Sequence, residues 1–134
     1  MNIPKISFMI SSNTFLLLPV IFSFIYGYWL YFFFASGICL FSFLYHIYRL
    51  KKPNSLYFSI FRTLDWLFAV GSFFYMYYFT YTVVSSEFTT MLFIMLSVVI
   101  LFFLYGWKYG DYHKQHPWFH VIASLVSALI LILT

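Results

Sequence analysis

Long apolar runs separated by short charged segments dominate the chain. No charged residue occurs from Ile6 to Tyr48, a run of 43 residues. A helix needs about 20 residues to cross the hydrocarbon core of a bilayer, so this run has room for two crossings. The Tyr-Gly-Tyr-Trp stretch at 26–29 suits a turn at the membrane interface, where aromatic side chains gather.

Three further apolar runs follow. The first holds 21 residues, from Trp66 to Ser86, and the second holds 20, from Phe88 to Trp107. The last begins near Pro117 and reaches Thr134. The pattern therefore predicts an all-α, polytopic transmembrane helix bundle. Its five spans are expected near residues 6–26, 29–49, 63–84, 88–107 and 116–134.

The first of these spans is the weakest, because it contains polar residues and a proline. Ser11, Ser12, Asn13 and Pro19 all lie within it. A four-span alternative therefore stays open, in which this segment is an interfacial helix rather than a crossing.

Composition agrees with a membrane protein. The chain is 64% hydrophobic and only 7% charged, whereas about a quarter of the residues of a soluble domain are charged. The net charge of +4 does not indicate nucleic-acid binding, because the few basic residues sit at the ends of apolar runs. No linker or repeat divides the chain, so we expect a single transmembrane domain over residues 1–134.

The basic residues predict the orientation. In the five-span arrangement every lysine and arginine falls on one side of the membrane, and Glu87 falls on the other. The basic residues are Lys5, Arg49, Lys51, Lys52, Arg62, Lys108 and Lys114. Because lysine and arginine collect on the cytoplasmic side, the N-terminus is expected to be cytoplasmic and the C-terminus to lie on the opposite side.

A few strongly polar residues remain near the ends of the spans, at a similar depth. Ser42 and His46 lie four residues apart, which places them on one face of the second span. Asp65 opens the third span, and His116 and His120, again four apart, open the fifth. In the five-span arrangement all five positions face the cytoplasmic side.

This grouping suits a zinc site. A catalytic zinc commonly has three protein ligands and an open position for water, and three histidines are one such set. Two histidines at i and i+4 of a helix can share one metal ion. The ion lowers the pKa of its bound water toward 7 and so supplies a nucleophile. An aspartate can relay the proton, and a serine hydroxyl can stabilise an oxyanion or support a ligand.

Simpler interpretations also apply to each residue alone. Asp65 can pair with Arg62 at the membrane edge, where charges are cheaper than at the bilayer centre. His46 can be an ordinary interfacial residue, and Ser42 can bond its own helix backbone.

The two C-terminal histidines carry a similar alternative, since His116 and His120 can be plain residues at the end of a loop. Pro117 disfavours helical geometry at His116, which predicts a cap there rather than an i,i+4 partner. Asp111 and His113 are most simply loop residues.

The joint order of these motifs is more specific than its parts. Ser-Phe-Leu-Tyr-His at 42–46 gives Ser-x-x-x-His, and Phe-Arg-Thr-Leu-Asp-Trp at 61–66 follows. His-Pro-Trp-Phe-His at 116–120 gives the closing His-x-x-x-His. This order resembles the CREST superfamily of membrane proteins. That superfamily includes the alkaline ceramidases, the progestin and adiponectin receptors with their hemolysin-III-like members, the Per1-like proteins and the myomaker-like branch.

The resemblance covers roughly residues 40–80 and 110–130. It implies a zinc ion held by His46, His116 and His120, with Ser42 and Asp65 beside the metal-bound water. The family has seven helices, whereas this chain has room for about five. A minimal member, a degenerate relative and a homo-oligomer that completes its bundle by self-association remain open as explanations.

The expected function is hydrolysis of an amide or ester bond in a membrane lipid, with Zn2+ as cofactor and no nucleic-acid partner. Zinc-bound water attacks the acyl carbonyl, zinc and Ser42 stabilise the oxyanion, and Asp65 handles the proton. One alternative is a non-catalytic receptor or scaffold that keeps zinc for structure. Another is a haem protein, because histidines on facing transmembrane helices can ligate haem iron.

Overall fold

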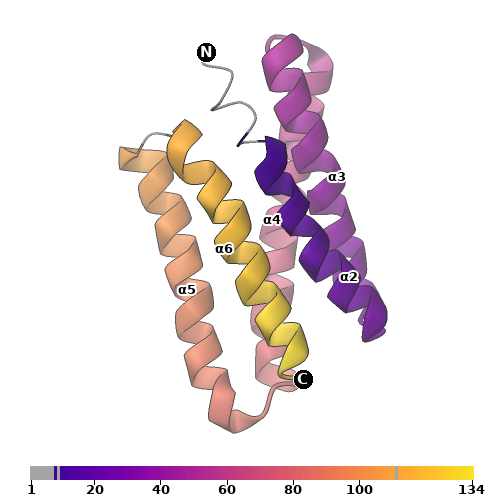
Figure 1. Cartoon of the computed structure of the whole chain (residues 1–134), viewed down its shortest axis with the longest axis vertical. Helices are drawn as coiled ribbons and strands as arrows, with labels where there is room; N and C mark the ends of the chain where they lie inside the picture. The colour runs from indigo at the N-terminus through magenta and orange to yellow at the C-terminus, as the bar shows by residue number, and fades with distance from the viewer. Residues whose placement is uncertain (1–7, 9, 111) are drawn as a thin grey trace.

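The chain folds into an all-α helix bundle, as the sequence predicts (Figure 1). The computed structural model describes residues 8, 10–110 and 112–134, and these contain no strand. A 3-10 turn, η1, leads into the first α-helix. The elements in chain order are η1 (Ser12–Leu16), α2 (Leu17–Ile25), α3 (Trp29–Lys51), α4 (Leu56–Thr82), α5 (Ser86–Tyr109) and α6 (Tyr112–Ile132).

Three helices are long and apolar enough to cross a membrane. They lie at Trp29–Lys51, Glu87–Tyr109 and Lys114–Ile132, close to the second, fourth and fifth predicted spans. Helix α4 is the longest at 27 residues and begins before the predicted third span. Its many tyrosines, together with Arg62 and Asp65, lower its mean hydropathy. The segment at Ser12–Ile25 is apolar but shorter than the others, and the four- and five-span alternatives differ there.

Successive helices run in opposite directions (Figure 1). The α3–α4 and α5–α6 connections lie at one end of the bundle, and the α4–α5 connection lies at the other. Arg49 and Lys51 end α3, and Lys108 lies in the last turn of α5, so these basic residues share one end. Glu87, in the first turn of α5, belongs to the opposite end. This separation of charge matches the expected topology; Lys5 lies outside the described residues.

Local sequence explains where helix α2 ends and where helix α4 begins. Gly27 has φ +73°, a backbone conformation that side chains disfavour, and it ends α2 at the predicted interfacial turn. The Tyr28 N–H then donates to the Ser23 carbonyl at 2.9 Å, which closes that turn. Ser55 caps α4, because its Oγ accepts a hydrogen bond from the Phe58 N–H at 3.1 Å.

Helices α3 and α4 pack closely because each presents a glycine to a phenylalanine of the other. The Phe68 ring lies directly against Gly37, and the Phe34 ring lies against Gly71. Small residues allow this close approach between apolar helices, where van der Waals packing is the main attraction. The buried core continues from this pair through Tyr31 to residues of α5 and α6.

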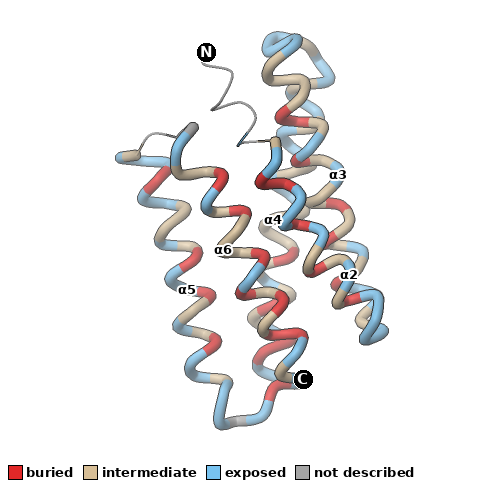
Figure 2. The backbone as a smooth tube through the Cα atoms, in the orientation of Figure 1, coloured by how far each residue is buried: buried red, intermediate tan, exposed pale blue. Residues whose placement is uncertain are grey.

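The outer surface of the bundle is strongly apolar. Exposed positions recur along every helix (Figure 2), and many of them are large hydrophobic side chains. All four tryptophans, Trp29, Trp66, Trp107 and Trp118, are more than half exposed. A water-soluble monomer rarely exposes so much apolar surface, so lipid is the solvent that this surface suits.

Candidate metal centre

Helix α3 supplies one histidine of the centre. His46 lies one turn after Ser42, and both side chains are fully buried. Tyr45 packs beside His46, with ring centroids 4.9 Å apart, and its hydroxyl accepts a hydrogen bond from Arg49 at 3.2 Å. The interfacial interpretation of His46 is therefore wrong, because the imidazole points into the bundle rather than toward water or lipid headgroups.

Helix α6 supplies two more histidines from one face. The helix begins at Tyr112 and contains Pro117, so His116 is helical despite the proline that follows it. The rings of His116 and His120 lie 4.5 Å apart at their centroids, as expected for an i,i+4 pair. The alternative in which Pro117 makes His116 a cap is wrong, because α6 begins at Tyr112 and continues through the proline, which the helix tolerates near its start.

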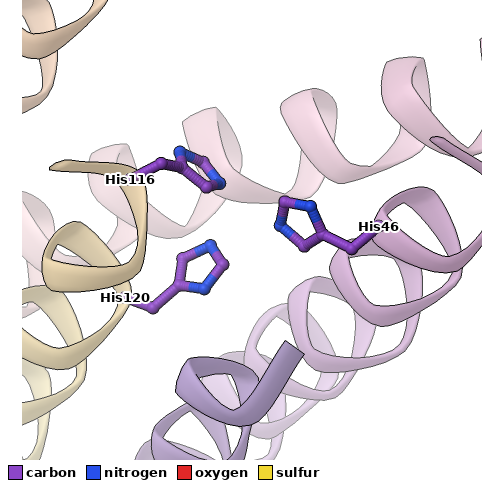
Figure 3. A group of neighbouring side chains, drawn as sticks. All are labelled: His46, His116 and His120. Atoms are coloured by element: carbon purple, nitrogen blue, oxygen red, sulfur yellow. The ribbon is translucent and has the colours of Figure 1, made fainter. Parts of the chain in front are cut away.

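The three imidazoles converge on one point (Figure 3). One ring nitrogen from each of His46, His116 and His120 lies within 4.8 Å of the other two. The ring centroid of His46 is 5.2 Å from that of His116 and 5.5 Å from that of His120. Two helices that are far apart in the sequence thus bring the predicted ligand set together.

The donor set fits a metal ion that prefers nitrogen. Tetrahedral zinc with Zn–N bonds of about 2.0–2.1 Å places ligand nitrogens about 3.4 Å apart. The nitrogens here are within about 1.5 Å of that spacing, which rotations of the imidazole rings can supply. His46 and His120 are buried, and Nε2 of His116 is buried as well. The arrangement can hold one small ion, shielded from competing water.

The sequence did not predict a contribution from the first segment. Ser12 of η1 is buried, and its Oγ lies 3.2 Å from Nδ1 of His120. Asn13 is buried beside it in the same turn. From the sequence, both residues only weaken the first span. The available signal was the run of four polar residues at 11–14 between apolar stretches, since buried polar groups need partners.

Asp65 lies outside the histidine group but beside Ser42. The Ser42 side chain lies near the Asp65 carboxyl. The contact falls short of ideal geometry, because Ser42 Oγ is buried without a hydrogen bond at standard distance and angle. Ser42 on α3 and Asp65 on α4 therefore face each other across the interface of these helices, and Ser42 lies one helical turn from His46.

The alternative partner of Asp65 is placed elsewhere. The Arg62 guanidinium lies over the Phe58 ring, 5.5 Å from its centroid. Within the part of the chain that the structure describes, Arg62 and Asp65 form no ion pair, so the simple surface-pair interpretation of Asp65 is not supported.

Aromatic side chains from α5 and α6 line the other side of the group. Phe103 of α5 has its ring centroid 6.5 Å from that of His116 and 4.7 Å from that of Phe119. Phe119 in turn packs against His116 at 6.2 Å. These rings give the centre an apolar wall. The expectation of a loop at His113 is wrong, because His113 belongs to α6; Asp111 and the side chain of His113 lie outside the described part of the structure.

Comparisons with known families, curated proteins and solved structures give no significant match to this chain.

Proposed function

We propose that the protein is a membrane-embedded zinc hydrolase that cleaves an amide or ester bond in a lipid. The observation that carries the proposal is the convergence of His46, His116 and His120, buried inside a bundle of apolar helices. Three neutral imidazoles leave the full positive charge of a divalent ion available for catalysis, and they leave one coordination position open. A bundle with a lipid-facing surface gives access to acyl chains rather than to water-soluble substrates.

When bound, zinc would supply Lewis acidity and an activated water molecule. The chain's own residues complete the reaction. Ser42 is placed to donate a hydrogen bond to the oxygen of the substrate carbonyl as negative charge develops there. In this proposal Asp65 would serve as the proton acceptor and would return the proton to the leaving amine or alcohol. The pairing of Ser42 with Asp65 supports these linked roles, because it holds both groups at one level of the bundle.

We also propose that the chain is a short relative of the CREST superfamily. Support comes from the order Ser-x-x-x-His, Asp and His-x-x-x-His along the chain, together with the meeting of the motif histidines in space. A two-helix deletion is compatible with this proposal, because the motif residues here lie on α3, α4 and α6.

A zinc-containing receptor or scaffold is the second candidate. The position of Asp65 outside the histidine group favours it, since a structural ion needs no proton acceptor nearby. The haem alternative is disfavoured by the histidine rings themselves. Haem iron takes at most two histidines, on opposite faces of the porphyrin, whereas three rings meet here with their centroids 4.5–5.5 Å apart.

One experiment separates these candidates. The purified protein in lipid nanodiscs is assayed for zinc content, for visible absorption, and for fatty-acid release from a long-chain N-acyl amide and from the matching ester. Zinc with fatty-acid release supports the hydrolase. Zinc with no release from either lipid would point to the receptor or scaffold, and a Soret band would identify haem.

A further inference from the structure

The first helical segment is part of the wall of the metal centre. η1 packs against both α3 and α6, the two helices that carry the histidines. Ser12 lies at this junction, is only 1% exposed, and places its Oγ 3.2 Å from Nδ1 of His120. A hydroxyl buried between two ligand-bearing helices is well placed to control how a ligand ring is presented.

An imidazole can bind a metal through one nitrogen only when its other nitrogen carries the proton. Residues that accept a hydrogen bond from this N–H fix the tautomer and the orientation of the ring. The contact with Ser12 occupies Nδ1 of His120, which leaves Nε2 to face the other two histidines. We propose that Ser12 is the positioning residue of His120: its Oγ accepts a hydrogen bond from Nδ1–H and so assigns Nε2 to the metal. This inference rests on the metal site of the proposed function.

The neighbouring hydroxyls show why Ser12 is suited to accept. Ser11 donates to the Phe8 carbonyl at 3.1 Å, and Thr14 donates to the Ser11 carbonyl at 2.6 Å. Ser23 in α2 donates in the same way to the Pro19 carbonyl at 2.6 Å. Hydroxyls on a helix commonly donate a hydrogen bond to the carbonyl one turn earlier, and their lone pairs can then accept another hydrogen bond. Ser12, on the same backbone geometry, can offer a lone pair to Nδ1–H.

The opposite direction of the hydrogen bond between Ser12 and His120 would prevent metal binding by Nε2. If Ser12 donated its proton to Nδ1, the neutral ring would carry its own proton on Nε2. That nitrogen could then not bind a metal without first losing its proton. The proposal therefore predicts a defined tautomer of His120 as well as an effect on metal binding, and the two can be measured separately.

Three substitutions test the role of the hydroxyl. Ser12→Thr keeps it, Ser12→Val removes it from a side chain of the same shape, and Ser12→Ala removes it from a smaller one. Threonine and valine have the same shape, so any loss of packing affects both variants equally. A difference in zinc affinity between them therefore reports the hydroxyl and not a folding defect. Ser23→Ala is the matched control, because Ser23 is also buried but bonds its own helix.

The readouts are zinc affinity by chelator competition, the absorption spectrum of the cobalt(II)-substituted protein, and 15N NMR of labelled histidine side chains, with His120→Ala for assignment. We expect Ser12→Val and Ser12→Ala to lose about 10–100-fold in zinc affinity and to shift the cobalt spectrum. Ser12→Thr and Ser23→Ala should behave like the wild type, and the metal-free wild type should show His120 protonated at Nδ1.

The two proposals fail in different ways. Equal zinc affinity and an unchanged His120 tautomer in the threonine and valine variants would overturn the role of Ser12. A wild-type His120 protonated at Nε2 would do so as well. A wild-type protein that binds no zinc would overturn the metal site and with it the assignment of Nε2 to a metal. The NMR spectrum of that metal-free protein would still show whether Ser12 sets the tautomer.

Discussion

The imidazole of His46 on α3 faces that of His120 on α6, with their ring centroids 5.5 Å apart. η1 packs against both helices and so holds them at a separation that two imidazoles can span. A third segment, η1, therefore helps to set the distance between these two candidate ligands.

The first prediction concerns metal content. The wild-type protein should bind about one zinc per chain, and His46→Ala, His116→Ala and His120→Ala should each release most of it, because two imidazoles cannot complete the site. The measurement is elemental analysis of protein purified without added chelator. His113→Ala is the control, since His113 lies outside the matched motif. Loss of metal from His113→Ala with retention in His116→Ala would show that the ligand assignment is wrong.

The second prediction concerns stability upon metal removal. A ligand that binds only the folded state stabilises it, by about 2.7 kcal/mol when its concentration is a hundred times its Kd. Chelation should therefore lower the Tm of the wild-type protein in detergent, and restored zinc should raise it again. The His46→Ala variant should show the same Tm with and without zinc. A wild-type Tm that does not respond to zinc would contradict a site that bridges α3 and α6.

The third prediction separates turnover from metal binding. Asp65→Asn keeps the size of the side chain and removes its charge, so it should retain most of the zinc and lose most lipid hydrolysis. The reason is that Asp65 lies beside Ser42 and outside the histidine group. Zinc content and fatty-acid release are measured on the same preparations. Ser42→Ala should likewise reduce turnover more than zinc content, by about 10–100-fold.

The ion-pair alternative for Asp65 has its own control. If Asp65 served only to pair with Arg62, the double variant Arg62→Gln with Asp65→Asn should keep full activity. We expect the double variant to be as inactive as Asp65→Asn, because Arg62 lies over Phe58 instead. A fully active double variant would remove Asp65 from the reaction.

The fourth prediction is topological. The basic ends of α3 and α5 should face the cytoplasm, so a cysteine at Asn2 should be labelled from that side and a cysteine at Thr134 from the other. The native Cys39, the only cysteine, is first replaced by serine to give a clean background. Labelling of both positions from one side would require an even number of spans and favour the four-span arrangement.

The fifth prediction concerns the α3–α4 interface. A Cβ at Gly37 would collide with the Phe68 ring, so Gly37→Ala should destabilise the bundle by about 1–3 kcal/mol. In a Phe68→Ala background the same change should cost much less, because the ring that it meets is gone. Unfolding in mixed micelles measures both steps of this cycle. Equal costs in the two backgrounds would show that the contact with Phe68 does not limit the approach of α3 and α4.

The sequence by itself determined the helices and the ligand residues. The charge-free runs are long enough for helices, and charged residues or Gly27 separate them. The predicted boundaries of α3 and α5 therefore lie within a few residues of those in the structure. Four-residue spacing placed Ser42 with His46 on one face of α3, because a helix repeats every 3.6 residues. These features depend on neighbours in the chain, which the sequence contains.

Only the tertiary structure decided how the helices meet. Helical periodicity could not show that η1 lies between α3 and α6, since packing partners distant in sequence leave no local pattern. The contact of Ser12 with His120 therefore emerged only from the fold, as did the position of Arg62 over Phe58 rather than at Asp65. The geometry at Pro117 was decided in the same way: a local preference against helix at His116 yields when the surrounding helix packs firmly against its neighbours.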